Sequence, residues 1–155
     1  EGKHLWILKV HPVDEKTIFA SKIFLNILLG GIPSIVASII VSFSIGFSYL
    51  PFLLILTLTN CLYASMIGLI CNLKHYKLDW KDEQEIVKQG MAVLIAMGLA
   101  VVPGVLLVIA YFAGLMNILS PLIYLSIACI VMIIIDVLLI KYLLTKGVKR
   151  FKEIN

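Results

Sequence analysis

The chain has 155 residues, of which 61% are hydrophobic and 14% charged, and its mean hydropathy is +1.07. A soluble domain has about half apolar and roughly a quarter charged residues, so this composition excludes an ordinary soluble protein. Thirteen Lys and Arg against nine Asp and Glu give a net charge of +4, which on a soluble chain would suggest nucleic-acid binding. Here the cations gather in three groups beside long apolar segments, which argues against a nucleic-acid partner.

Four segments are long and apolar enough to cross a bilayer, whose hydrocarbon core needs about 20 helical residues. They span residues 23–43, 50–70, 91–113 and 122–144. The first three contain no charged residue, and the fourth contains Asp136 and a terminal Lys141. The sequence therefore predicts an all-α membrane protein, a single transmembrane domain with four helices in two hairpins.

The cationic residues indicate the orientation of these helices. All of them fall in the stretch before the first span, in the loop between spans two and three, or in the final stretch from Lys141 onward. The connections 44–49 and 114–121 carry no charged residue. By the positive-inside rule, we expect both termini and the middle loop to be cytoplasmic, as segments 1–22, 72–90 and 145–155.

Two of the spans carry stripes of small residues at intervals of four. Such stripes allow another helix to approach closely, within this chain or across a dimer. Three residues of the first stripe bear hydroxyl groups, so a polar translocation surface is the alternative interpretation. The stripes are Gly30, Ser34, Ser38 and Ser42 in the first span, and Ala92, Ala96 and Ala100 in the third.

Prolines interrupt the same two spans. Pro33 and Pro103 each lack an N–H group, so they leave the carbonyls of Leu29 and Leu99 without a helical partner. A neighbouring helix can satisfy such carbonyls, and the kink can also act as a hinge. The sequence leaves both roles open.

Asp136 is the acidic residue within a predicted span, where an ionised carboxylate costs about 2.5–3.5 kcal/mol. We expect it to face the other helices, either in a protonated or hydrogen-bonded structural role or in a functional one. Asn26, Asn60 and Asn117 are weaker intramembrane candidates of the same kind.

No catalytic or metal-binding pattern is present in the sequence. It lacks H-E-x-x-H, G-x-S-x-G and the phosphate-binding G-x-x-x-x-G-K-[ST], and it has no second carboxylate in a span. The three histidines have no metal-ligand spacing, and the three cysteines are expected to be small buried apolar residues. We expect no enzyme activity, no cofactor and no metal in this chain.

Two short amphipathic segments are predicted on the cytoplasmic side. Residues 3–9 combine Trp6 with flanking lysines, which suits a helix at the lipid headgroups. Pro12 ends that segment, and Asp14 is placed to cap a helix that begins at Glu15 and continues into the first span. Residues 77–89 predict a second helix, with Asp79 as its cap. These segments either anchor the span ends or dock a cytoplasmic partner.

The same two segments resemble those of a known family. Glu1-Gly2-Lys3-x-x-Trp6-Ile7-Leu8-Lys9-x-x-Pro12 and Asn72-Leu73-Lys74 with Asp79-Trp80-x-x-Glu83-x-x-x-Val87-Lys88-Gln89 are similar to ABC-2-type transporter permeases, the membrane subunits of ABC exporters in Firmicutes. Val10 stands where that family usually has serine, and Tyr76 where it usually has proline. The chain starts without Met, and the resemblance implies that it is the C-terminal part of such a permease.

The resemblance implies a multi-pass subunit of a bacterial plasma membrane. Its partners would be an ABC ATPase subunit, which holds ATP and Mg²⁺, and a second permease copy or paralogue. A secondary carrier or channel subunit that uses Asp136, and a membrane assembly protein without transport activity, are the alternatives. The residues expected to structure or contact the ATPase interface are Trp6, Lys9, Pro12, Asp79, Trp80, Glu83, Lys88 and Gln89.

Overall fold

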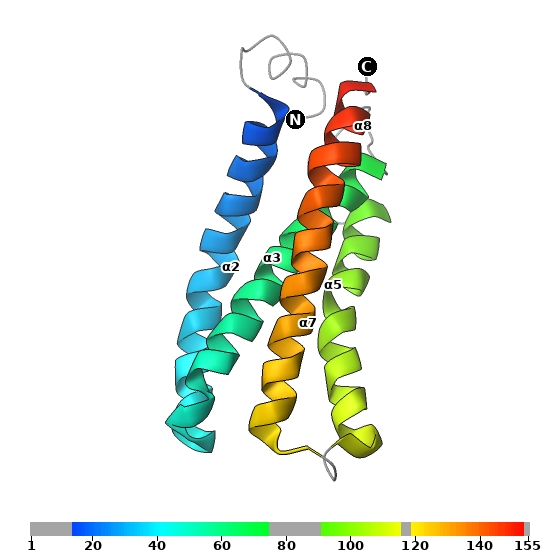
Figure 1. Ribbon diagram of the computed structural model, residues 1–155. Coiled ribbons are helices and arrows are strands. Elements are labelled where there is room, and N and C mark those ends of the chain that lie inside the picture. Colours follow the sequence, from blue (N-terminus) through cyan, green and yellow to red (C-terminus); the bar gives the residue numbers. More distant parts are fainter. Residues whose placement is uncertain (1–13, 75–90, 116–118, 154–155) are drawn as a thin grey trace.

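The computed structural model describes residues 14–74, 91–115 and 119–153 (Figure 1). Within these ranges the chain is helical apart from short turns, and no strand is present. Four helices are long and apolar enough to cross a bilayer: α2 (Glu15–Ile45), α3 (Leu50–Lys74), α5 (Met91–Ala110) and α7 (Pro121–Tyr142). The predicted all-α class and four apolar helices are confirmed.

The start of α2 follows the prediction closely, but its cap differs. The helix begins at Glu15 and runs without a break through the first predicted span. Asp14 occupies the N-cap position, yet its side chain makes no capping hydrogen bond. Its backbone carbonyl instead accepts hydrogen bonds from the N–H groups of Thr17 and Ile18. The acidic Glu15 in the first turn suits the positive end of the helix dipole.

Glycine or proline lies at helix ends beside the two uncharged connections, 44–49 and 114–121. α2 ends at Gly46, whose φ of +116° is a conformation that glycine adopts readily, and a short 3-10 turn, Phe47–Tyr49, leads into α3. Pro51 and Pro121 lie in the first turns of α3 and α7, where a missing N–H group has no cost.

The later helices continue beyond the predicted spans. α5 passes into a π-helical turn, Tyr111–Leu115, and α7 passes through another, Leu143–Gly147, into α8 (Val148–Glu153). Most of the predicted cytoplasmic segment 145–155 is therefore a helical extension of α7.

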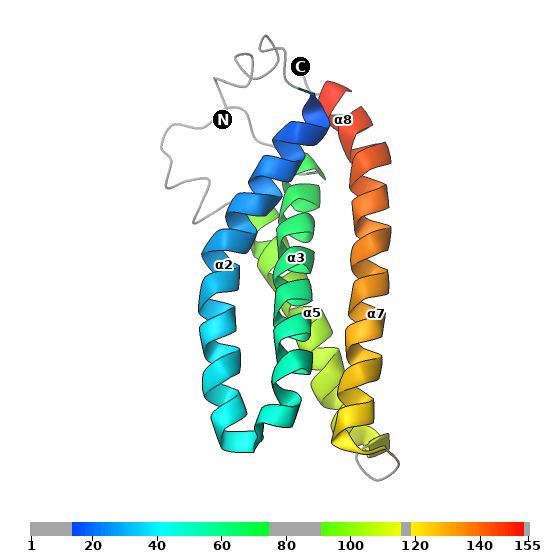
Figure 2. The ribbon, with the colours of Figure 1, turned by 60° about the vertical axis from the view of Figure 1, so that its left-hand side comes forward.

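The helices lie side by side with α3 at the centre (Figures 1 and 2). α2 begins and α8 ends at one end of the molecule, here called the terminal end, whereas residues 46–49 and 119–120 lie at the opposite turn end. α3 packs against α2, α5 and α7, and α5 and α7 contact α3 more than each other. The helices of the second predicted hairpin, α5 and α7, are thus antiparallel, and each packs mainly against α3.

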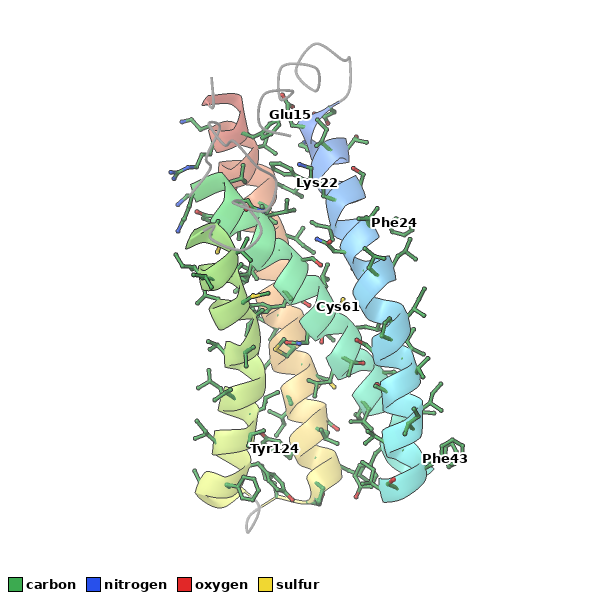
Figure 3. The ribbon with its side chains drawn as sticks, turned by 180° about the vertical axis from the view of Figure 1, so that it is seen from behind. Glu15, Lys22, Phe24, Phe43, Cys61 and Tyr124 are labelled. Carbon is green, nitrogen blue, oxygen red and sulfur yellow. The ribbon has the colours of Figure 1, made fainter. Side chains whose placement is uncertain are left out.

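The apolar core is concentrated at the terminal end. Phe19 and Phe151 make an edge-to-face contact there, with ring centroids 5.6 Å apart. Most large apolar side chains elsewhere face outward, as Phe24 and Phe43 do in Figure 3. Such outward apolar surfaces suit a lipid environment rather than water. The buried members of the core cluster are Ile18, Phe19, Met66, Leu73, Leu143 and Phe151.

Candidate functional site

A cavity of about 320 Å³ lies where all four long helices meet, and we call it the central cavity. Ser34 and Thr57 place hydroxyl groups at its wall, and Asn60 adds a carboxamide. The remaining lining is apolar or small. Its lining residues are Gly30 and Ser34 of α2; Leu56, Thr57, Asn60, Cys61 and Ala64 of α3; Pro103, Gly104 and Leu107 of α5; and Met132 of α7.

A larger cavity of about 610 Å³, the lateral cavity, opens between α3 and α5. It shares Asn60, Ala64 and Gly104 with the central cavity, so the two adjoin at these residues. Its outer wall is formed by exposed apolar side chains of α5, such as Val101 and Val105. The space therefore extends from the exposed apolar surface of α5 toward the middle of the helix bundle.

Pro103 is buried at the wall of the central cavity, and it leaves the Leu99 carbonyl without a helical hydrogen bond. The Tyr63 hydroxyl of α3 donates a hydrogen bond to the Leu99 carbonyl of α5, at 3.3 Å. A side chain of the neighbouring helix thus satisfies the backbone group that the proline leaves open. Tyr63 is absent from the predicted residues, because nothing in the local sequence indicates which helix a tyrosine in an apolar span will face.

The small-residue stripe of α2 lies along its contact with α3. A Cβ atom placed on Gly30 would lie 2.8 Å from the Cys61 sulfur, so the two helices approach closely there. Ser38 is buried, and its hydroxyl lies 3.2 Å from that of Thr57. Ser42 is fully buried, and its hydroxyl donates to the Ile39 carbonyl of its own helix.

The alanine stripe of α5 and the remaining asparagine have different surroundings. Ala92 is buried, Ala96 is half-buried, and Ala100 lines the lateral cavity. The Asn26 side chain is exposed on α2, whereas its backbone carbonyl lies 3.8 Å from the Cys61 sulfur. The structure therefore brings Asn60, and not Asn26, to the cavities.

Asp136 is buried at the face of α7 that also buries Cys129 and Met132. Its side chain is 3% exposed, and neither carboxyl oxygen has a hydrogen-bond partner among the described residues. Met132, one helical turn earlier, lines the central cavity, but Asp136 itself does not. The carboxyl group is thus buried within the bundle and is not exposed on its outer surface.

A third cavity, of about 470 Å³, lies at the turn end and has aromatic walls formed in part by Tyr49, Tyr111 and Tyr124. The Tyr124 hydroxyl of α7 donates a hydrogen bond to the Leu107 carbonyl of α5, and the rings of Tyr111 and Tyr124 are 5.4 Å apart. Tyrosine is favoured at membrane interfaces. This cluster joins α5 to α7 near their connection.

The predicted docking residues Trp6, Lys9, Pro12, Asp79, Trp80, Glu83, Lys88 and Gln89 lie outside the described residues, as does Asn117. In the ranges that the structure covers, no group of three or more His, Cys, Asp or Glu side chains could hold a metal ion. What the described site offers is space with a few uncharged hydrogen-bonding groups.

Comparison with protein-family models, with curated proteins and with solved structures found no match to this chain.

Proposed function

We propose that this chain is the membrane-spanning permease subunit of an ABC-2-type transporter that works as an exporter. The observation that carries the proposal is the central cavity, to which all four long helices contribute. Helices that serve only to pack would be expected to close such a space, because dispersion contacts are lost around a void. Segments 1–12 and 72–89 resemble those of ABC-2-type permeases, and this resemblance suggests the class of transporter.

The distribution of charge supports an orientation with both termini of this segment in the cytoplasm of a bacterium. Within the described ranges, the cationic residues belong to the portions of the helices nearer the terminal end, and the turn end has none. In this orientation, segments 1–13 and 75–90 would face the partner ATPase. The described cationic residues are Lys16, Lys22, Lys74, Lys141, Lys146, Lys149, Arg150 and Lys152.

In such a transporter, ATP hydrolysis and substrate movement would be carried out by different chains. ATP and Mg²⁺ would be bound by the ATPase subunit, and a second permease copy or paralogue would complete the transmembrane pathway. This chain would supply the helices that move and the space that the transported molecule occupies. The docking segments would pass the movement of the ATPase to α2, α3 and α5, because each of these helices borders one of the segments.

Co-purification tests this function directly. The full-length chain is expressed in its host with an affinity tag, and we expect an ABC ATPase subunit to be retained with it. Trp6→Ala and Trp80→Ala should each lose that subunit while the permease still inserts in the membrane. Phe112→Ala is the matched control, because Phe112 is an exposed aromatic residue near the turn end.

Two results would count against the proposal, and they differ in meaning. If both tryptophan variants keep the ATPase, the docking assignment is wrong. If the unaltered chain binds no ATPase under mild extraction, the ABC class itself is wrong.

A secondary carrier is the second candidate, and burial of the Asp136 carboxyl group without a partner favours it. In a carrier driven by an ion gradient, such a group would take up the coupling ion. Transport into vesicles that depends on a proton gradient, needs no ATP and is abolished by Asp136→Asn would support this candidate over the first. ATP-dependent transport that survives Asp136→Asn would exclude it.

A further inference from the structure

Gly104 lies in the interior of α5, at the boundary that the two cavities share. Glycine in a helix interior destabilises the helix by roughly 0.5–1 kcal/mol relative to alanine. Gly104 has no positive φ, and a Cβ atom placed on it would meet nothing within 4 Å. It lines both the central and the lateral cavity. Neither backbone conformation nor close helix packing requires glycine here, and a larger side chain would extend into the shared space.

The polar groups around this space have a definite hydrogen-bonding character. The Ser34 hydroxyl donates to the Gly30 carbonyl at 2.7 Å, and the Thr57 hydroxyl donates to the Leu53 carbonyl at 2.8 Å. Their protons are thus occupied, and their oxygens can still accept. The Asn60 carboxamide makes no hydrogen bond within the described part of the chain. Its two N–H donors and its oxygen are free for a bound molecule.

The cavity walls also exclude a charged occupant. Neither set of lining residues includes Asp, Glu, Lys, Arg or His among the described residues. A bound ion would therefore lose its hydration without gaining a counter-charge, which is costly inside a bilayer. Apolar side chains make up most of the walls, so an occupant with a long apolar part would be stabilised by contact with them.

We propose that the joined cavities bind an uncharged amphiphile, a lipid-like molecule with an ester or hydroxyl group that pairs with the Asn60 carboxamide. The molecule would enter from the bilayer between α3 and α5, since the lateral cavity opens there. This inference rests on the proposed transport function and assigns its substrate class. Binding can be measured without the ATPase, so the two proposals can fail separately.

The test is photolabelling of the full chain in lipid nanodiscs with a diacylglycerol that carries a diazirine on an acyl chain. We expect labelled peptides from the α3 and α5 segments around Asn60 and Gly104, with labelling competed by unlabelled diacylglycerol. Gly104→Leu fills the space and should lower the labelling about fivefold. Gly98→Leu is the matched control, because Gly98 also has open space around it but lines neither cavity.

A second pair of variants tests the polar contact at Asn60. This pair keeps the proposal testable if Gly104→Leu does not fold. Asn60→Leu should lower labelling about fivefold, as expected for loss of one hydrogen bond. Thr59→Val removes a hydroxyl from the adjacent position, which lines neither cavity, and should leave labelling unchanged. A diazirine phosphatidylglycerol, which carries a phosphate charge, should label these peptides more weakly than diacylglycerol.

Three outcomes would overturn the proposal. The first is equal labelling of Gly104→Leu, Asn60→Leu and the unaltered chain, which would indicate general contact with bilayer lipid. The second is labelling by the phosphatidylglycerol probe as strong as that by the diacylglycerol probe. The third is rapid disulfide-linked dimer formation by Gly104→Cys in a chain without its other cysteines, which would show that a second copy covers the opening.

Discussion

Asp136 is buried in a way that a water-soluble protein would rarely tolerate. An unpaired buried polar group costs about 1–3 kcal/mol, and a charged one costs more. The structure offers its two carboxyl oxygens no donor among the described residues, although α3 packs against α7. A residue retained at such a cost is a candidate for a role in function rather than in stability.

Replacing Asp136 should therefore stabilise the protein. For Asp136→Leu we expect the free energy of unfolding to rise by about 1–3 kcal/mol, because the substitution removes an unpaired buried carboxyl group and breaks no hydrogen bond among the described residues. Thermal unfolding in one detergent measures the change. Ser126→Ala is the control, since the Ser126 hydroxyl bonds only to the Leu122 carbonyl of its own helix. A lower midpoint for Asp136→Leu would mean that the carboxyl group has a stabilising partner.

Gly30 gives a second prediction at the scale of the residue. Gly30→Ala should destabilise the protein by about 1 kcal/mol, because its Cβ would lie 2.8 Å from the Cys61 sulfur and push α2 from α3. Cys61→Ala should remove most of that penalty in the double variant. Gly68→Ala, at a position with open space, should be neutral or stabilising. Equal penalties for Gly30→Ala with and without Cys61 would show that the contact is unimportant.

At the scale of the element, length and hydropathy predicted the helices well but not their partners. The predicted start at 50 coincides with the first residue of α3, because Pro51 is a local signal for the first turn of a helix. The central position of α3 has no such signal. Four spans of similar hydropathy look alike in sequence, and the contact between Tyr63 and Leu99 joins residues far apart in the chain. The same reason explains why Asn60 could be named as a candidate but not distinguished from Asn26.

The hydrogen bond between α3 and α5 predicts a coupling between two positions. Tyr63→Phe should lower the free energy of unfolding by about 1 kcal/mol, since it leaves the Leu99 carbonyl unpaired. Pro103→Ala restores the N–H group that would bond to that carbonyl within α5. In the Pro103→Ala background, Tyr63→Phe should therefore cost much less. A double-mutant cycle on unfolding measures this difference, and additive effects would show that the tyrosine does not compensate for the proline.

At the scale of the whole molecule, the two ends of the helix bundle differ in their charged and aromatic residues. The terminal end combines the core cluster with most of the described charge, and the turn end has tyrosines and no charged residue in the described ranges. Basic residues stay on the cytoplasmic side of a membrane, and tyrosine collects at either interface. The asymmetry thus predicts one orientation for all four helices at once.

Labelling from outside the cell tests that orientation. In a variant without Cys61, Cys71 and Cys129, a single cysteine is placed at Ser48, exposed in the turn after α2, or at Lys149, exposed in α8. A membrane-impermeant maleimide should label Ser48→Cys in intact cells, because positions near the turn end would face outward. It should label Lys149→Cys only after the membrane is opened, since the cationic end would face the cytoplasm. The reverse pattern would invert the orientation, and it would also place segments 1–13 and 75–90 where no cytoplasmic ATPase could reach them.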